Sequence, residues 1–412
     1  MIRTSTLASG IRLVTEQMSD VSSVCVGVWV GTGARDETAE QAGISHFLEH
    51  LLFKGTDSRS ARDIAEAVDA VGGDMNAYTT KEYTTFYVRT LAEHLELPLD
   101  ILADILREPA FRSDEVDAER QVILEEVLMH LDEPADVVQE RFNDAMFPGH
   151  PLGREVLGEP ERVKAVTVAE IRRFFEEHYL PGNMVVAAAG DLEHDEVAAA
   201  IERRFRGSGG RPPGRLPPAD GPRPLSVETR DSEQAHLVLG VRALRRRDPD
   251  RFSLAALNHV LGGGLSSRLF QEVREARGLA YSIGSDRVAY EDTGTLSVSV
   301  GTAPEHVPEV LGLIERELDA VQADGITERE LEVAKGHFRA DLLLSLEDSG
   351  SRMSRIGASL LLYGEVLTVE QLLGRIDEVS LDSVRHLAKR LLGSERVLAA
   401  VGPFDEGDFP PS

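Results

Sequence analysis

The chain has a single cysteine, Cys25, among its 412 residues. No disulfide can therefore form within it, which favours a reducing compartment. The neighbours of Cys25 are apolar and β-branched, a pattern that predicts a core residue in a buried strand rather than a nucleophile. No apolar run reaches the roughly 18 to 20 residues of a membrane span, and the first ten residues lack the apolar stretch of a secretory signal. We predict a cytoplasmic protein with no membrane partner.

Positive charge is scarce, because 44 Lys and Arg residues stand against 71 Asp and Glu, a formal net charge of −27. Such a balance repels phosphate backbones and anionic headgroups, so nucleic acid is excluded as an expected partner and basic ligands are favoured. The hydrophobic share of 42% and the charged share of 28% are ordinary for a globular protein. The length suffices for two or three domains.

A proline-rich stretch divides the sequence. Residues 207–224 hold six of the 19 prolines and no periodic apolar pattern, which predicts a linker between a domain at 1–206 and a second at 225–412. Three short segments of the first part recur in order in the second, at offsets of 209 to 212: 48–52 at 257–261, 90–94 at 302–306, and 185–190 at 397–402. The recurrence predicts a duplicated domain.

Both parts mix strand-like segments with helix-periodic ones, without regular βαβ spacing. The predicted strands are 23–30, 84–88, 236–241 and 295–300, and the predicted helices are 44–53, 60–71, 93–106, 113–130, 305–323 and 328–346. We therefore predict an α+β fold of two homologous α/β-sandwich domains. In each, helices pack on an antiparallel or mixed sheet.

The helix predicted at 44–53 carries the pattern H-x-x-E-H as His46, Glu49 and His50. At about 100° per residue, the two imidazoles and the carboxylate project from one side of the helix. Two imidazole nitrogens can bind a metal while the carboxylate deprotonates a bound water, and this order is known from zinc peptidases. Because the flanking residues are apolar, the helix is predicted to be buried, which favours a metal site over a solvated polar face.

A catalytic zinc needs a third protein ligand. The helix predicted at 113–130 offers Glu119 and Glu126, which are seven residues apart on one stripe with Val116. Glu125 points about 100° away from Glu126 and is the alternative ligand on local geometry alone. A surface salt bridge is the alternative interpretation of Glu119 and Glu126.

The second half lacks most of this chemistry. Ala255, Asn258 and His259 stand where the first half has its two histidines and its glutamate. Only one half is therefore expected to hold a metal, and His259 is predicted to be a core or cap residue. The glycines at 262–264 are followed by no Lys-Ser/Thr, so we reject a phosphate-binding loop.

Three segments, GISHFLEHLLFKGT, GGDMNAYTTKEYTTFYV and AERQVILEEV, resemble the pitrilysin-type metallopeptidases of family M16. The similarity spans essentially the whole chain and is greatest to the β-subunits of mitochondrial processing peptidases and their bacterial relatives. It implies one Zn²⁺ per chain, held by His46, His50 and Glu126, with Glu49 as the base. It also implies that Glu119 supports the ligands and is needed for activity.

The same resemblance assigns roles to four further residues. The segment GGGLSSRLFQEVREARGLAYSIGS is similar to the family's second half, where an Arg and a Tyr bind substrate and stabilise the tetrahedral intermediate. These residues match Arg274 and Tyr281. Asn76 and Ala77 match a strand edge beside the zinc, where the substrate backbone adds as an extra strand.

Together these features predict a zinc-dependent endopeptidase that cleaves peptides or unfolded protein segments. The resemblance implies a chamber formed by two chains, in which Arg274 and Tyr281 serve the zinc site of the other subunit. A homodimer is the simplest expectation, since one chain carries both motifs, and the acidic charge favours basic peptides. The alternative is a non-catalytic core or partner subunit of a heteromeric processing complex, although such relatives generally have broken motifs.

Overall fold

A computed structural model describes residues 1–205 and 209–409 of the chain. It divides into two compact units. The first unit comprises Met1–Leu128, Glu155–Leu216 and Leu343–Val366, and the second comprises Met129–Arg154, Pro217–Leu342 and Leu367–Ser412. Residues 207 and 208, the start of the predicted linker, lie outside the described residues.

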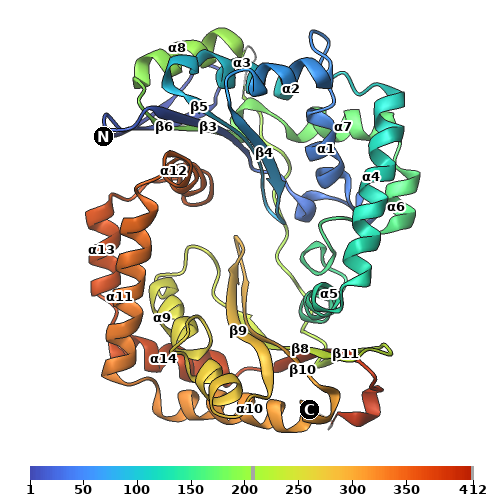
Figure 1. The fold of residues 1–412 in the computed structure, drawn as a ribbon, viewed down its shortest axis with the longest axis vertical. Coiled ribbons are helices and arrows are strands. Elements are labelled where there is room, and N and C mark those ends of the chain that lie inside the picture. The colour runs from blue at the N-terminus through green and yellow to red at the C-terminus, as the bar shows by residue number, and fades with distance from the viewer. Residues whose placement is uncertain (206–208, 410–412) are drawn as a thin grey trace. The chain divides into compact units, whose positions relative to one another are not determined.

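The first unit contains a six-stranded mixed sheet in the order β1-β2-β6-β3-β5-β4 (Figure 1). Its strands are β1 (Ile2–Thr6), β2 (Arg12–Gln17), β3 (Ser23–Val30), β4 (Asp74–Thr79), β5 (Thr84–Leu91) and β6 (Met184–Gly190). Strands β2 and β6 are parallel, and every other pair is antiparallel. The strand β4 therefore lies at one edge of this sheet.

The second unit contains a five-stranded sheet in the order β7-β11-β8-β10-β9. Its strands are β7 (Leu225–Thr229), β8 (Ala235–Ala243), β9 (Ala280–Ala289), β10 (Gly294–Thr302) and β11 (Arg396–Gly402). Here the pair β7 and β11 is parallel and the others are antiparallel. Apart from the extra strand β1, the two sheets share one order and one pattern of directions, as expected for a duplicated domain.

Helices cover both sheets. Those of the first unit are α1 (Ile44–Leu52), α2 (Ala61–Asp69), α3 (Glu96–Arg107), α4 (Ser113–Asp132, whose last residues fall in the second unit), α6 (Pro160–Ala165), α7 (Val168–His178), α8 (His194–Arg204) and α12 (Ser349–Tyr363). Those of the second are α5 (Pro134–Met146), α9 (Arg251–Leu261), α10 (Val307–Asp324), α11 (Glu328–Ser345, whose last residues fall in the first unit), α13 (Val369–Asp377), α14 (Leu381–Leu392) and a π-helical turn at Phe270–Glu275. The strands and helices predicted from the sequence are all present, with ends that differ by at most three residues.

Two helices lie in one unit although their position in the sequence would assign them to the other. The helix α5 precedes the linker but packs on the second sheet, where Phe142 and Val138 join a core cluster with strand β11. The helix α12 follows the linker but packs on the first sheet, where Met353 and Ile356 join a cluster with β3 and β6. The boundaries of the two compact units therefore differ from the predicted domain division at residues 206 and 225. The physical reason is that α5 buries its apolar face on the second sheet and α12 buries its apolar face on the first.

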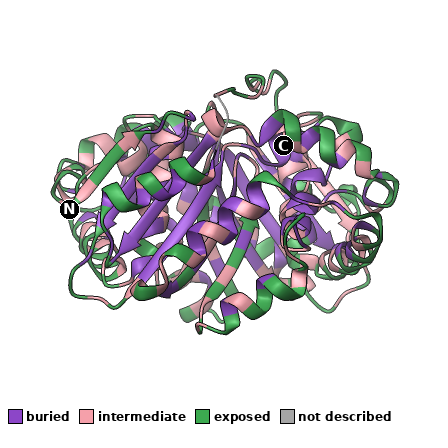
Figure 2. Ribbon diagram, turned by 90° about the horizontal axis from the view of Figure 1, so that it is seen from above, coloured by how far each residue is buried: buried purple, intermediate pink, exposed green. Residues whose placement is uncertain are grey.

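The central strands are buried on both faces, as Figure 2 shows, because helices lie on both sides of the sheet. Trp29 of β3 is 1% exposed and lies against two glycines. An added Cβ would lie 2.7 Å from its ring at Gly27 and 2.4 Å at Gly357 of α12. Cys25 on the same strand is a free, buried thiol whose pKa burial raises to about 12, which confirms the prediction of a core residue.

Arg215 and Leu216 of the predicted linker are hydrogen-bonded to other residues of the first unit. The guanidinium of Arg215 donates to Asp36 Oδ2 over 2.7 Å and to the carbonyl oxygen of Gly31 over 3.1 Å. Arg35 donates to the carbonyl oxygen of Leu216 over 2.8 Å.

Within the described ranges, no helix has the length and apolarity that crossing a membrane requires.

Candidate metal centre

The helix α1 presents the H-x-x-E-H residues inside the first unit. It begins after Gly43, whose φ of 93° favours glycine, and it runs to Leu52. His46 is 6% exposed, and Glu49 and His50 are partly buried. The apolar residues around them form the core face of the helix, as the sequence predicts.

The structure brings Glu126 of α4 to both histidines. Glu126 Oε2 lies 3.6 Å from His46 Nε2 and 3.5 Å from His50 Nε2, and the two Nε2 atoms are 3.2 Å apart. Ligand atoms at about 2.0–2.1 Å from a tetrahedral zinc lie about 3.3–3.4 Å from one another. The three donor atoms therefore fit a tetrahedral ion without rearrangement. Among the described residues, no other group of three or more His, Cys, Asp or Glu side chains lies close enough together to hold a metal ion.

The side of this cluster next to Glu126 is open. The Glu126 side chain is 44% exposed, whereas that of His46 is 8% exposed. A catalytic zinc keeps a position for water, and an exposed side provides the access that such a position needs. Glu125, the ligand that local geometry left as an alternative, is exposed and lies outside the group.

Glu119 lies behind His50 and is 5% exposed, which does not match a surface salt bridge. With Nε2 facing the cluster, His50 Nδ1–H donates to Glu119 Oε1 over 2.8 Å. Lys54 Nζ lies 2.7 Å from the other carboxylate oxygen. Burial raises the pKa of Glu119, but hydrogen bonds from His50 and Lys54 outweigh it and leave that pKa below its usual value. A carboxylate on the second nitrogen of a ligand histidine orients the ring.

Lys54 was not among the predicted site residues. Its sequence signal was its position four residues after His50, in the segment that carries the motif. The lysine holds the Glu119 carboxylate in its charged form, which keeps an acceptor facing His50.

The carboxylate of Glu49 lies against the end of strand β4. Burial raises its pKa, and hydrogen bonding with Thr79 partly opposes that rise. Its Oε2 atom is buried without a hydrogen-bond partner among the described residues. One acceptor oxygen of Glu49 is therefore not engaged by any residue that the structure describes. Burial, followed by the charge of the neighbouring His50, lowers the pKa of His46 to about 3. His46 is therefore neutral and can offer a nitrogen lone pair to a metal.

Asn76 and Ala77 lie on β4, the edge strand that pairs only with β5 among the described strands. Asn76 is exposed, and its side-chain oxygen accepts the Ala77 N–H over 2.8 Å. The structure thus places both residues at a sheet edge as predicted. It also shows that the N–H group of Ala77 already has an intrachain partner.

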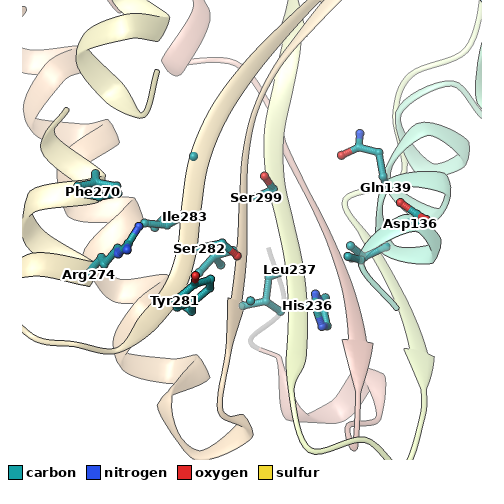
Figure 3. Close-up of a pocket in the computed structure, with 15 residues that line it drawn as sticks. Asp136, Gln139, His236, Leu237, Phe270, Arg274, Tyr281, Ser282, Ile283 and Ser299 are labelled. Carbon is teal, nitrogen blue, oxygen red and sulfur yellow. The ribbon is translucent and has the colours of Figure 1, made fainter. Parts of the chain in front are cut away.

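Arg274 and Tyr281 lie together in the second unit. The Arg274 guanidinium carbon is 5.3 Å from the ring centroid of Tyr281 and 4.7 Å from that of Phe270, a cation–π arrangement. Tyr281 is 82% exposed and is the second residue of the edge strand β9. All three line a cavity of about 610 Å³ that also includes His236 of β8 and Asp136 of α5 (Figure 3).

His259 of α9 is 8% exposed, which agrees with the prediction of a core residue. Its ring stacks on His337 of α11 with centroids 4.4 Å apart. The loop at Gly264 covers it, since an added Cβ there would lie 2.9 Å from the imidazole.

Comparison with known proteins yields matches along the whole chain. The family profile described as Insulinase (Peptidase family M16) matches residues 12–160, and the profile described as Peptidase M16 inactive domain matches residues 165–337. An uncharacterized zinc protease of Mycobacterium leprae is 46% identical, covering 97% of this chain and 91% of its own. An uncharacterized zinc protease of Bacillus subtilis is 39% identical, with both chains fully covered.

Two solved structures share the fold. A peptidase M16 inactive domain from Pseudomonas fluorescens superposes with a TM-score of 0.91 at 21% identity, over 98% of each chain. A protease from Helicobacter pylori superposes with a TM-score of 0.90 at 23% identity, over 98% of this chain and 99% of that one. Both support the α+β architecture with mixed sheets.

Proposed function

The chain belongs to peptidase family M16, and on this premise we propose that it is a zinc-dependent endopeptidase. The observation that carries the proposal is the cluster of two imidazole nitrogens and one carboxylate oxygen at 3.2–3.6 Å, matched to a tetrahedral ion. Zinc is also the metal in the names of the related proteases. The expected content is one Zn²⁺ per chain, held by His46, His50 and Glu126.

A bound Zn²⁺ would supply Lewis acidity, which acidifies a coordinated water and polarises a carbonyl group. Glu49 would take the proton of the attacking water on its unengaged oxygen and deliver it to the leaving amine nitrogen. Glu119 would hold the ring of His50 in the ligating tautomer through its hydrogen bond to Nδ1. These roles need no movement of the ligand side chains.

The substrate class follows from the edge strand and the charge. An exposed strand edge binds an extended backbone with little regard to side chains, so β4 with Asn76 and Ala77 suits peptides or unfolded segments. For that binding, the Asn76 side chain must release the Ala77 amide. The net charge of −27 favours basic peptides.

Arg274 and Tyr281 would bind the substrate and stabilise the oxyanion. Their arrangement supports this role, since an exposed phenol is held beside a guanidinium. Following the family resemblance, we propose a homodimeric chamber in which this pair serves the partner's zinc site. A particle of twice 45.0 kDa in light scattering is the expected result.

The test compares wild type with Glu49→Gln on a quenched basic peptide of about a dozen residues, with the metal content of each protein measured. Glu125→Gln is the matched control, because it removes an exposed carboxylate next to a ligand. We expect about one Zn²⁺ in all three proteins and a loss of at least about 10²-fold in kcat for Glu49→Gln alone. Bound zinc without hydrolysis in wild type would favour the alternative, a non-catalytic partner or core subunit.

A further inference from the structure

The helix that carries both histidines receives its N-terminal cap from a residue outside it. Its N-cap residue, Gly43, has no side chain to accept the first free N–H groups. Glu37 takes this role, because its Oε2 accepts from Gly43 N–H over 2.9 Å and its Oε1 accepts from Ser45 N–H over 2.7 Å. The carboxylate is 4% exposed and lies at the positive end of the helix dipole.

The two ligand histidines are supported unequally. Glu119 orients the ring of His50 through Nδ1. The Nδ1 atom of His46 is buried and has no hydrogen-bond partner in the described part of the chain. The direction of the His46 ring therefore depends on packing and on the backbone of the first helical turn. Ser45, whose amide Glu37 holds, directly precedes His46.

The segment that carries Glu37 is itself anchored. Arg35 forms an ion pair with Glu82 at 2.6 Å, and both side chains are 1% exposed. Asp36 accepts from Arg215 of the linker over 2.7 Å. Because its neighbours are fixed on two sides, the Glu37 carboxylate is a rigid support for the helix.

We propose that Glu37 is a positioning residue for His46: through the amides of Gly43 and Ser45 it sets the first turn of α1 so that Nε2 points at the metal. The proposal rests on the zinc site of the proposed function, but it concerns metal affinity and not turnover. Glu37 touches neither metal nor substrate in this scheme.

Three variants separate charge, reach and general effects. Glu37→Gln removes the charge and turns an amide NH₂ toward one of the two N–H donors, so one hydrogen bond is lost. Glu37→Asp keeps the charge but shortens the side chain by one methylene group. Glu40→Gln removes an exposed carboxylate from the same segment and is the matched control.

The experiment measures Zn²⁺ affinity of the full chain by competition with a chromogenic chelator, without substrate. Loss of a residue that orients a ligand typically costs about 10–100-fold in affinity, and we expect this for Glu37→Gln, with about 3–10-fold for Glu37→Asp. Glu40→Gln should stay within about twofold of wild type. Amide exchange in the first turn of α1 should rise in Glu37→Gln.

A double-mutant cycle distinguishes positioning from general destabilisation. In a His46→Ala background, Glu37→Gln should cause no further loss of affinity, because the ligand that it orients is already gone. A further loss of about 10-fold or more there would overturn the proposal, since Glu37 would then act on the site as a whole.

The outcomes also separate this proposal from the proposed function. If Glu37→Asp and Glu37→Gln both bind zinc within about twofold of wild type, Glu37 is not a positioning residue, whatever the activity. If Glu37→Gln does not fold, Glu37→Asp decides by the same criterion. If wild type binds zinc but cleaves no peptide, the peptidase proposal fails and the affinity comparison still stands.

Discussion

Replacing Gly357 by alanine should destabilise the first unit, although alanine is the better helix former. Gly357 lies in the middle of α12, and an added Cβ would lie 2.4–2.6 Å from three ring atoms of Trp29. The ring cannot move away, because Trp29 is 1% exposed and Gly27 touches it as well. The substitution therefore forces a shift of the helix or of the sheet.

Two opposing effects set the size of the change. Alanine in place of glycine inside a helix gains about 1 kcal/mol. Overpacking a closed core costs about 1–3 kcal/mol, and the short distances to a rigid ring put this position at the upper end. The net expectation is a loss of about 1–2 kcal/mol, or roughly 2–8 °C in Tm for a unit of this size.

The assay uses the chain's own probe, since Trp29 is its one tryptophan. Its fluorescence during urea or thermal unfolding reports the first unit. The control is Gly336→Ala in α11, where an added Cβ meets nothing within 4 Å. The free energy of unfolding of that variant should rise by about 0.5–1 kcal/mol, as measured by far-UV circular dichroism.

The two glycine variants must therefore change the free energy of unfolding in opposite directions. If Gly357→Ala raised the midpoint of the Trp29 transition, α12 would not pack on β3. The assignment of this helix to the first unit would then be wrong.

Two further predictions concern carboxylates that are held by hydrogen bonds. Glu119→Gln should weaken Zn²⁺ affinity by about 10–100-fold because His50 loses its charged acceptor, whereas Glu125→Gln should change it less than about twofold in the same chelator competition. Equal affinities would contradict the role of Glu119. In the second unit, Arg268 bonds Glu330 at 2.6 Å. Burial raises the pKa of Glu330, but the hydrogen bond from Arg268 and others outweigh it and leave the pKa below 4.5. A depressed pKa stabilises the fold above the unfolded value and loses that effect as pH falls through the folded value. Glu330→Gln should therefore be less stable than wild type at pH 7. In urea unfolding the difference should shrink as pH falls below about 4.3, the unfolded value, and vanish below the depressed folded value. A constant difference across this range would refute the argument.

Much of the site was predictable because its signals are local. His46, Glu49 and His50 belong to one helix, and a period of 3.6 residues puts them on one side whatever surrounds that helix. The apolar residues between them predict burial, and buried imidazoles require a partner. The recurrence of short segments likewise predicts two similar domains, and the shared strand order of the two sheets agrees with it.

Contacts between distant segments were beyond local reasoning. Periodicity left Glu125 and Glu126 both open as ligands, and the resemblance chose Glu126, which the structure brings to the histidines. The cap that Glu37 supplies to α1 was also missed. Its carboxylate reaches the helix through a loop, and no spacing rule describes that path.

The sequence by itself determined the four strands and six helices predicted from it, and which residues of α1 face one another, because those properties depend on neighbours along the chain. It did not determine which sheet each helix covers. The helices α5 and α12 were not among the predicted segments, and two homologous sheets offer similar apolar surfaces for a helix to cover. Only the tertiary structure decided that each helix packs on the sheet built by the other half, where Phe142 lies against Gly240 and Gly357 against Trp29.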